Sequence, residues 1–299
     1  MANAKDVLYS IRSIQDTMKI TNAMYLVSSS KLRRARKNLP AIYDYFETMQ
    51  NTIHDILCCM PELEHIYLKD HIDDPQSRRA YVVITADKGL AGIYNQAIIK
   101  LTETELRHYP NARLYVVGQV GRRYFTKKTD RADETFLYSA QDPSLQRARN
   151  IMMDLLNLYR GDQIDEVFVI YTEMITQLHI EPRILKILPL DRAEFITTKQ
   201  ENRPHMADFF PSAATVMSKV APIYMSGMLF GALNESYCAE LSARMTAMDS
   251  ATKNATDMIQ ELRLLYNRSR QAAITQEITE VVGGAKAFKQ KKAGKGESL

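Results

Sequence analysis

The residues with the most obvious capacity for chemistry form a short glycine turn, Asp87-Lys-Gly-Leu-Ala-Gly92, just after the apolar run Tyr81–Thr85. A glycine turn between a strand and a helix is where α/β folds hold phosphate groups. However, the turn lacks the full G-x-G-x-x-G pattern, and the sequence contains no G-x-x-x-x-G-K-[ST]. Asp87 and Lys88 could form a catalytic pair. Adjacent charged residues of this kind are more often turn and surface residues. We therefore expect a tight turn without a bound nucleotide.

Histidines and cysteines are the other chemically capable residues. The six histidines are scattered, and none lies four residues from another or beside a plausible nucleophile. Cys58 and Cys59 are adjacent while Cys238 is remote, which gives none of the Cys/His spacings of a metal site. We expect no catalytic residues, no metal and no cofactor in this chain, and thiols that stay reduced in a cytosol-facing protein.

A polar string, Arg270-Gln-Ala-Ala-Ile-Thr-Gln276, is better suited to recognition than to catalysis. Arg270 carries a rigid fork of donors that suits carboxylates, and Gln271, Thr275 and Gln276 add further hydrogen-bonding groups. These polar groups replace apolar residues near the end of a long helical pattern. The string is either a solvated helix end or a contact with another protein, and its chemistry alone leaves both interpretations open.

Two long helices at the ends of the chain must position these residues. The segment Ala232–Val282 has no Gly or Pro, and as one helix it would be about 77 Å long. A second such run, Met1–Leu39, opens the sequence. Apolar positions recur in steps of four and three from Val7 to Met60 and from Val216 to Tyr266, the heptad spacing of a coiled coil. We expect the two ends to pair as a long antiparallel coiled coil.

Proline and glycine mark the expected interruptions of these helices. Pro40 predicts a kink or break near Leu39, and Pro222 predicts a bend or a break close to the lower end of the C-terminal helix. Gly283-Gly284 predicts the end of that helix. Small or polar residues weaken the middle of the first apolar stripe, namely Thr21, Ser28 and Ala35.

The middle of the chain alternates strands with helices. Strands are expected at Tyr81–Thr85, Arg113–Val117, Thr135–Tyr138, Glu166–Thr172 and Arg183–Pro189. Helices are expected from Gly92 to about His108, at Val120–Lys127 and at Ser144–Tyr159. This alternation predicts an open, mostly parallel, Rossmann-like α/β domain over residues 75–195. The remaining boundaries are an N-terminal coiled-coil helix at 1–60, a C-terminal coiled-coil helix at 208–287 and a basic flexible tail at 288–299.

Charge and hydropathy exclude several classes of function. The net charge of +4 is too small to indicate nucleic-acid binding. Charged residues near the N-terminus interrupt the apolar core that a signal peptide would need. No apolar run approaches 18 residues, so we expect no membrane span. The basic stretch Lys31–Lys37 is either a solvated face or a surface for acidic protein loops or lipid head groups.

Several segments together resemble the gamma subunit of F-type ATP synthase, of the bacterial type, in one order over nearly the whole chain. The first are Ile11-Arg-Ser-Ile14, Thr17-Met-Lys-Ile-Thr-Asn-Ala-Met24 and Val27-Ser-Ser-Ser-Lys-Leu32. The middle contributes Thr85-Ala-Asp-Lys-Gly-Leu-Ala-Gly92 with Tyr94-Asn95. The most specific are Ala243-Arg-Met-Thr-Ala-Met248, Tyr266-Asn-Arg268, Arg270-Gln271 and Ile274-Thr-Gln-Glu-Ile278. One departure is Ala91, where the family commonly has Cys.

The resemblance implies a non-catalytic rotor shaft. Such a subunit carries ion-driven rotation of the membrane ring of c subunits to the catalytic hexamer of alpha and beta subunits, for ATP synthesis, and it regulates ATPase activity. The epsilon subunit is a further partner, and membrane association at the cytoplasmic face is peripheral, through partners alone. By the same resemblance, Arg270, Gln271, Thr275 and Gln276 contact a beta-subunit loop, with Lys88 as a second contact region. Phe209, Phe210 and Pro211 fall where family members approach the c ring.

Two other classes of function compete with this interpretation. In an enzyme, the middle domain would be a nucleotide-binding catalyst, but the phosphate loop and an acid–base pair are missing from the sequence. A generic coiled-coil scaffold with a non-catalytic α/β domain would explain the helices but not the polar string at Arg270. Co-purification of the catalytic hexamer from membranes separates a rotor subunit from a scaffold.

Overall fold

The computed structural model describes residues 4–37, 39–69, 74, 76–176, 179–197 and 209–293. The chain forms two compact units, a larger one at Leu26–Ala247 and a smaller one that combines Met1–Tyr25 with Met248–Leu299. The first helix, α1, spans Ala4–Lys37, and α2 spans Leu39–Cys59. The break expected near Leu39 is therefore confirmed. Pro40 is the second residue of α2, a position where a missing backbone N–H costs little because no intrahelical acceptor exists for it.

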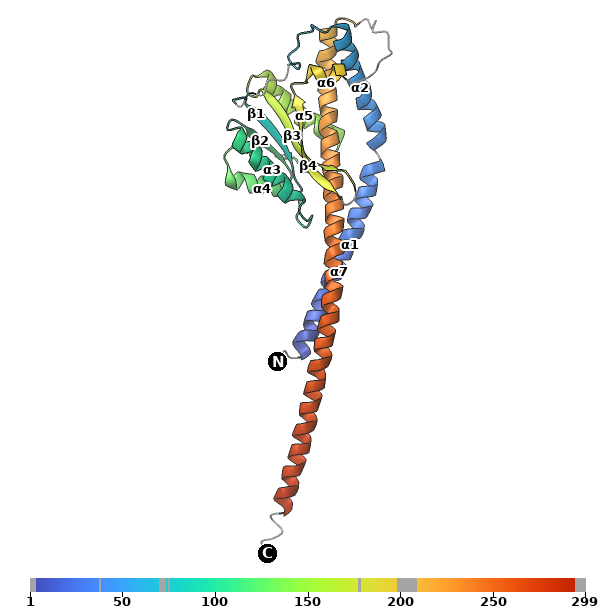
Figure 1. Ribbon diagram of the computed structural model, residues 1–299, viewed down its shortest axis with the longest axis vertical. Helices are drawn as coiled ribbons and strands as arrows, with labels where there is room; N and C mark the ends of the chain where they lie inside the picture. The colour runs from blue at the N-terminus through green and yellow to red at the C-terminus, as the bar shows by residue number, and fades with distance from the viewer. Residues whose placement is uncertain are drawn as a thin grey trace. The chain divides into compact units, whose positions relative to one another are not determined.

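A four-stranded sheet forms the centre of the larger unit (Figure 1). Its strands are β1 Arg79–Ile84, β2 Arg113–Val117, β3 Glu166–Met174 and β4 Ile180–Leu188, in the order β2-β1-β3-β4. β1 pairs in parallel with β2 and β3, whereas β4 runs antiparallel to β3. The prediction of an open, mostly parallel sheet between two long terminal helices is confirmed.

The prediction of a strand at Thr135–Tyr138 is wrong. On the side of β2 away from β1, the described residues form one isolated bridge, between Leu114 and Ala132. Directly afterwards, Asp133 Oδ1 accepts hydrogen bonds from the N–H of Thr135 at 2.8 Å and from its hydroxyl. Such an Asx turn bends the backbone out of the ladder, so β-branched and aromatic composition did not suffice to make a strand here.

Side chains of β1 alternate between two apolar layers. Tyr81 and Val83 pack with helices α3 (Tyr94–His108) and α4 (Gln119–Lys128) on one face. Val82 and Ile84 face the opposite layer, which combines α5 (Leu145–Arg160) with α2 and the first turns of α7. A short helix, α6 (Arg192–Thr197), adds Phe195 to that layer. Because both faces are covered, all six residues of β1 are buried.

The C-terminal helix α7 spans Ala213–Ala293, 81 residues without a break. Neither the break considered at Pro222 nor the stop expected at Gly283-Gly284 occurs, so the predicted helix end is wrong. Around Pro222 the helix is held by complete burial of Met217, Ala221 and Met225 in the core. At Gly283-Gly284, two glycines cost a helix about 1 kcal/mol each, which good helix formers on both sides offset.

One stretch of α7 is long and apolar enough to cross a membrane by length and composition, with a mean hydropathy of 1.3 over 18 residues. Half of that stretch is buried inside the protein. The core helices of water-soluble proteins meet the same criterion, so the stretch is weak evidence for a span.

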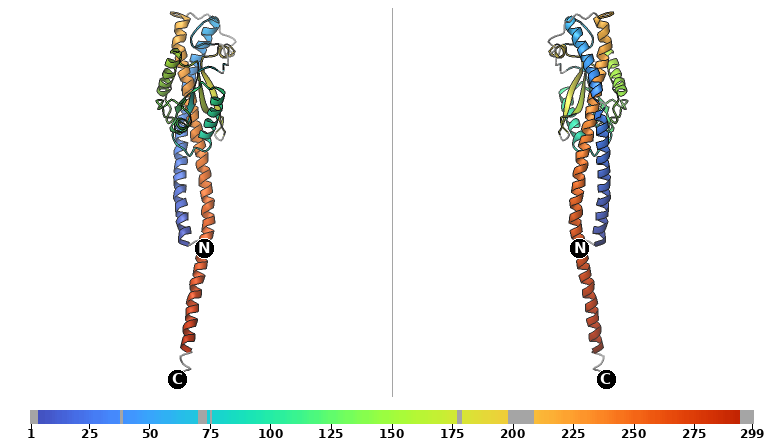
Figure 2. Two further views of the ribbon diagram at one scale, coloured as in Figure 1. Left: turned by 90° about the vertical axis from the view of Figure 1, so that its left-hand side faces the viewer. Right: turned by 90° about the vertical axis from the view of Figure 1, so that its right-hand side faces the viewer.

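In the smaller unit, α1 and α7 lie side by side and run antiparallel (Figure 2). Val7 and Ile11 pack on Ile259, within a seam that also takes in Ile14, Met18, Leu262 and Tyr266. Farther along, Thr21 and Thr252 share a hydrogen bond of 2.8 Å between their hydroxyls. The heptad pairing predicted from the sequence is therefore present, and the weakly apolar middle of the stripe uses a polar contact in place of a packed one.

Candidate functional site

The polar string at the end of α7 lies fully on the surface of the smaller unit. All residues from 270 to 285 are exposed. Thr275 donates its hydroxyl proton to the Gln271 carbonyl oxygen at 2.9 Å, and Gln276 donates from Nε2 to Glu280 Oε1 at 3.0 Å. Arg270 has no hydrogen-bond or ion-pair partner among the described residues. Its five guanidinium donors are thus open to a partner's carboxylates or carbonyl groups.

Apolar side chains alternate with this polar string. Ile274 is 46% exposed, Ile278 58% and Val281 72%. Exposed isoleucine and valine on successive turns of one helix are expected to be covered in an assembly, since water would otherwise meet a continuous apolar strip. The end of α7 therefore exposes hydrogen-bonding groups and apolar side chains side by side.

The Asp87–Gly92 turn belongs to the larger unit, and its residues have structural roles. Asp87 Oδ1 accepts the N–H of Gln119 at 3.1 Å, and Oδ2 accepts hydrogen bonds from Ser139 and Ala140 at 2.5 and 3.1 Å. This carboxylate ties three loops together, so it is not placed as a catalytic base. Lys88 is exposed, which leaves its ammonium group accessible to a partner.

A buried ion pair on α7 braces the same turn, and sequence analysis missed it. Glu240 Oε1 and Arg244 Nη1 are 2.7 Å apart, with the carboxylate side chain only 3% exposed. Arg244 also donates to the carbonyl oxygens of Lys88 and Gly89, at 3.4 and 3.3 Å. Burial raises the pKa of the Glu240 carboxyl, while Arg244 acts in the opposite direction. The available signal was a Glu and an Arg four residues apart within an otherwise apolar helix face.

The three residues expected near the membrane ring differ in exposure. Phe209 is partly buried against the main core, whereas Phe210 is 93% exposed. Pro211 is exposed as well, just before Ser212, whose side chain accepts the Thr215 N–H at 3.2 Å and caps α7. Phe210 and Pro211 are therefore the members of this set that are available to a partner. Phe209 instead anchors the start of the helix.

The geometry defines a class of protein: an α/β body that carries one very long helix, whose residues 270–285 are exposed. Residues 3–288 match the family described as ATP synthase. The chain is 41% identical over 290 residues to the ATP synthase gamma chain of Ruminiclostridium cellulolyticum, covering 96% of this chain and 99% of that one. Identity to the ATP synthase gamma chain of Acetivibrio thermocellus is 41% over 298 residues, covering 97% and 100%.

The chain therefore belongs to the ATP synthase gamma chain family. The fold agrees with a chain of the Euglena gracilis mitochondrial ATP synthase, described as OSCP/F1/c-ring in rotational state 3. That match has a TM-score of 0.69 at 17% identity and covers 99% of this chain and 97% of the other. At this identity the likeness bears on the fold alone.

Proposed function

We propose that this chain is the central rotor shaft of an F-type ATP synthase, which transmits ion-driven rotation of the c ring to the catalytic hexamer. One observation carries the proposal. Helix α7 is a single continuous element that begins in the apolar core of the α/β body and ends in the exposed surface at residues 270–285. Each elementary charge that crosses 100 mV supplies about 2.3 kcal/mol, and energy from several ions must reach the hexamer through one stiff element.

The partners follow from this role. The alpha and beta subunits enclose the shaft, and the epsilon subunit and the c ring meet the body of the chain, with Phe209, Phe210 and Pro211 in the ring contact. The chain is then peripheral, on the cytoplasmic face of the cell membrane, and reaches the membrane through partners alone. Within it, 1–60 and 208–287 act as the shaft, 75–195 as the α/β domain and 288–299 as a basic tail. Affinity purification from membranes, with subunits identified by mass, tests the partner set.

We assign coupling to the exposed end of α7, where Arg270, Gln271, Thr275 and Gln276 grip a beta-subunit loop, with Lys88 as a separate contact in the larger unit. A charge-assisted hydrogen bond contributes about 1.5–3 kcal/mol. Losing two such residues changes assembly or rotation without unfolding α7, because the side chains are exposed and support no internal packing.

The test is a double substitution, Arg270→Ala with Gln271→Ala, in membranes that contain the assembled enzyme. ATP synthesis and ATP hydrolysis should fall together, by about tenfold or more, while the c ring still conducts ions and the free chain keeps its helicity. Arg268→Ala is the matched control, because residue 268 is also exposed but lies about 200° around the helix from residue 270. Wild-type rates of both ATP synthesis and ATP hydrolysis in the double variant would show that the polar string is only a solvated helix end.

A further inference from the structure

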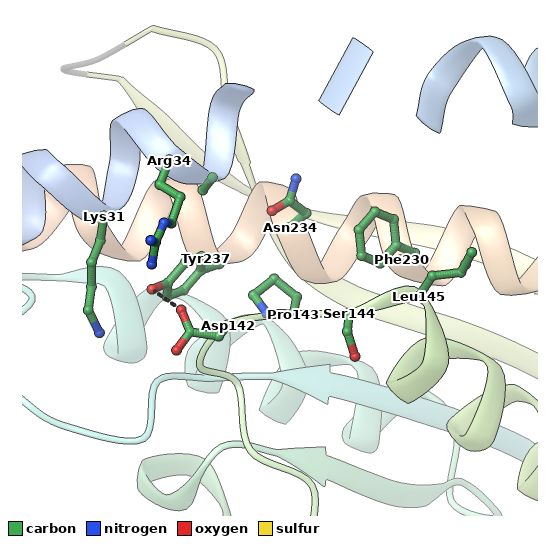
Figure 3. A pocket seen from close by; sticks show the side chains of 10 residues that line it. Lys31, Arg34, Asp142, Pro143, Ser144, Leu145, Phe230, Asn234 and Tyr237 are labelled. Carbon is green, nitrogen blue, oxygen red and sulfur yellow. Dashed lines mark hydrogen bonds between the residues drawn. The ribbon is translucent and has the colours of Figure 1, made fainter. Parts of the chain in front are cut away.

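A pocket of about 540 Å³ belongs to the larger unit (Figure 3). Three segments form its walls. α1 contributes Lys31, Arg34 and Ala35, and α7 contributes Phe230, Asn234 and Tyr237. The loop that leads into α5 contributes Asp142, Pro143 and Ser144, with Leu145 opening the helix. The volume is within the range of sites for small organic ligands.

Two cations line this pocket, and Lys31 also lies close enough to the buried Glu240 carboxyl to act toward lowering its pKa. Neither Lys31 nor Arg34 has a hydrogen bond or ion pair with any described residue. Asp142 supplies one negative charge, but its Oδ1 already accepts the Tyr237 hydroxyl at 3.1 Å. The lining therefore carries a net positive charge, and in Figure 3 the two cations lie toward the same end of the pocket.

A buried amide gives the second, independent sign of a ligand. Asn234 is only 5% exposed and lines the pocket, yet its side chain has no hydrogen-bond partner among the described residues. Figure 3 shows it between Arg34 and Phe230, over Pro143. The amide atoms are open to the pocket and available to hydrogen-bond a molecule bound there.

The N-terminus of α5 adds to the positive electrostatic potential of the pocket. Ser144 caps this helix of 16 residues by accepting the Arg147 N–H. Arg147 in turn donates to the carbonyl oxygens of Gln141 and Asp142, at 2.6 and 3.4 Å, which fixes the loop that forms the pocket floor. The positive end of the α5 dipole adds to the positive potential of the pocket lining.

From these features we propose that the pocket binds a phosphate monoester that carries a flat apolar group. The phosphate would meet Lys31, Arg34 and the Asn234 amide, and the apolar group would lie against Phe230, Pro143 and Leu145. This site is separate from the coupling surface, so its failure would leave the rotor assignment untouched.

Three probes test the site on the unmodified full-length chain: phenyl phosphate, inorganic phosphate and phenol, each followed by calorimetry and ligand-observed NMR. Phenyl phosphate should bind at least about tenfold more tightly than either fragment, and binding should weaken as salt is raised. No phenyl phosphate binding at 10 mM (about 2.7 kcal/mol of affinity) would overturn the proposal, as would equal binding of phenol.

Variants then locate the site. Lys31→Gln with Arg34→Gln should weaken phenyl phosphate binding about tenfold or more, and Asn234→Ala should weaken it severalfold. The matched control is Arg33→Gln, because Arg33 is an exposed cation of the same helix that does not line the pocket. Circular dichroism checks the fold of each variant. Equal loss in the control, or unchanged affinity in the double variant, would show that phenyl phosphate binds elsewhere.

Discussion

Gly227 and Gly231 lie one turn apart on α7, and the structure predicts opposite outcomes when each is changed to alanine. Gly227 is buried, and a Cβ atom added there would overlap the ring of Phe46 from α2. At Gly231 the added atom would meet nothing within 4 Å. Both positions are helical, so the gain in helix propensity is the same for the two and the steric environment is the only difference.

The magnitudes follow from these two contributions. Replacing Gly with Ala inside a helix stabilises it by about 1 kcal/mol. Gly231→Ala should therefore raise the free energy of unfolding by about that amount. At Gly227 the same gain is opposed by overpacking, which typically costs about 1–3 kcal/mol. A cavity of about 320 Å³ borders both Phe46 and Gly227, and movement of the ring into it limits the cost. The two variants should differ by about 1–3 kcal/mol, with Gly227→Ala the less stable.

Urea unfolding of the full chain measures this difference. The sequence has no Trp but 16 Tyr, so near-ultraviolet circular dichroism of the tyrosines reports loss of core packing in the larger unit. Adding Phe46→Leu to Gly227→Ala should recover part of the lost stability, whereas adding it to Gly231→Ala should only destabilise. Equal stability of the two alanine variants would refute the argument that Phe46 seats on Gly227.

Two further predictions concern the buried charge network and the shaft. Burial alone would raise the pKa of Glu166, but Lys186, Ser77 and Arg79 more than offset it and hold the pKa below 4.5. The ionised carboxylate therefore stabilises the fold above about pH 4.5, and that contribution is lost as pH falls through the lowered value. Glu166→Gln should cost about 3 kcal/mol at pH 7 and progressively less as the pH falls below 4.5 in urea titrations, and a pH-independent loss would contradict the network. In the free chain, amide protons of residues 10–35 should exchange faster than in the assembled enzyme, because polar Thr21 weakens the seam; strong protection in the free chain would contradict this.

The sequence by itself determined the elements whose signal is local or periodic. Heptad spacing from Val7 onward and the run Ala232–Val282 predicted two long paired helices, because each apolar stripe must be buried whatever partner it finds. β-Branched runs at Tyr81–Thr85 and Glu166–Thr172 predicted central strands for the same reason. The polar string at Arg270 was visible because it interrupts an apolar stripe, and family resemblance gave it a role.

Only the tertiary structure decided features that depend on contacts between distant segments. Whether α7 stops at Gly283, or breaks at Pro222, is settled by cooperative helix propagation and by burial of neighbouring turns, not by one residue's propensity. Thr135–Tyr138 has strand composition, yet the hydrogen bonds of Asp133 prevent it from pairing. The pocket beside Asn234 joins three segments that are far apart in the sequence, and no local pattern reveals that this amide will line it. Such sites arise from long-range packing, because burial and charge at a point depend on everything that surrounds it.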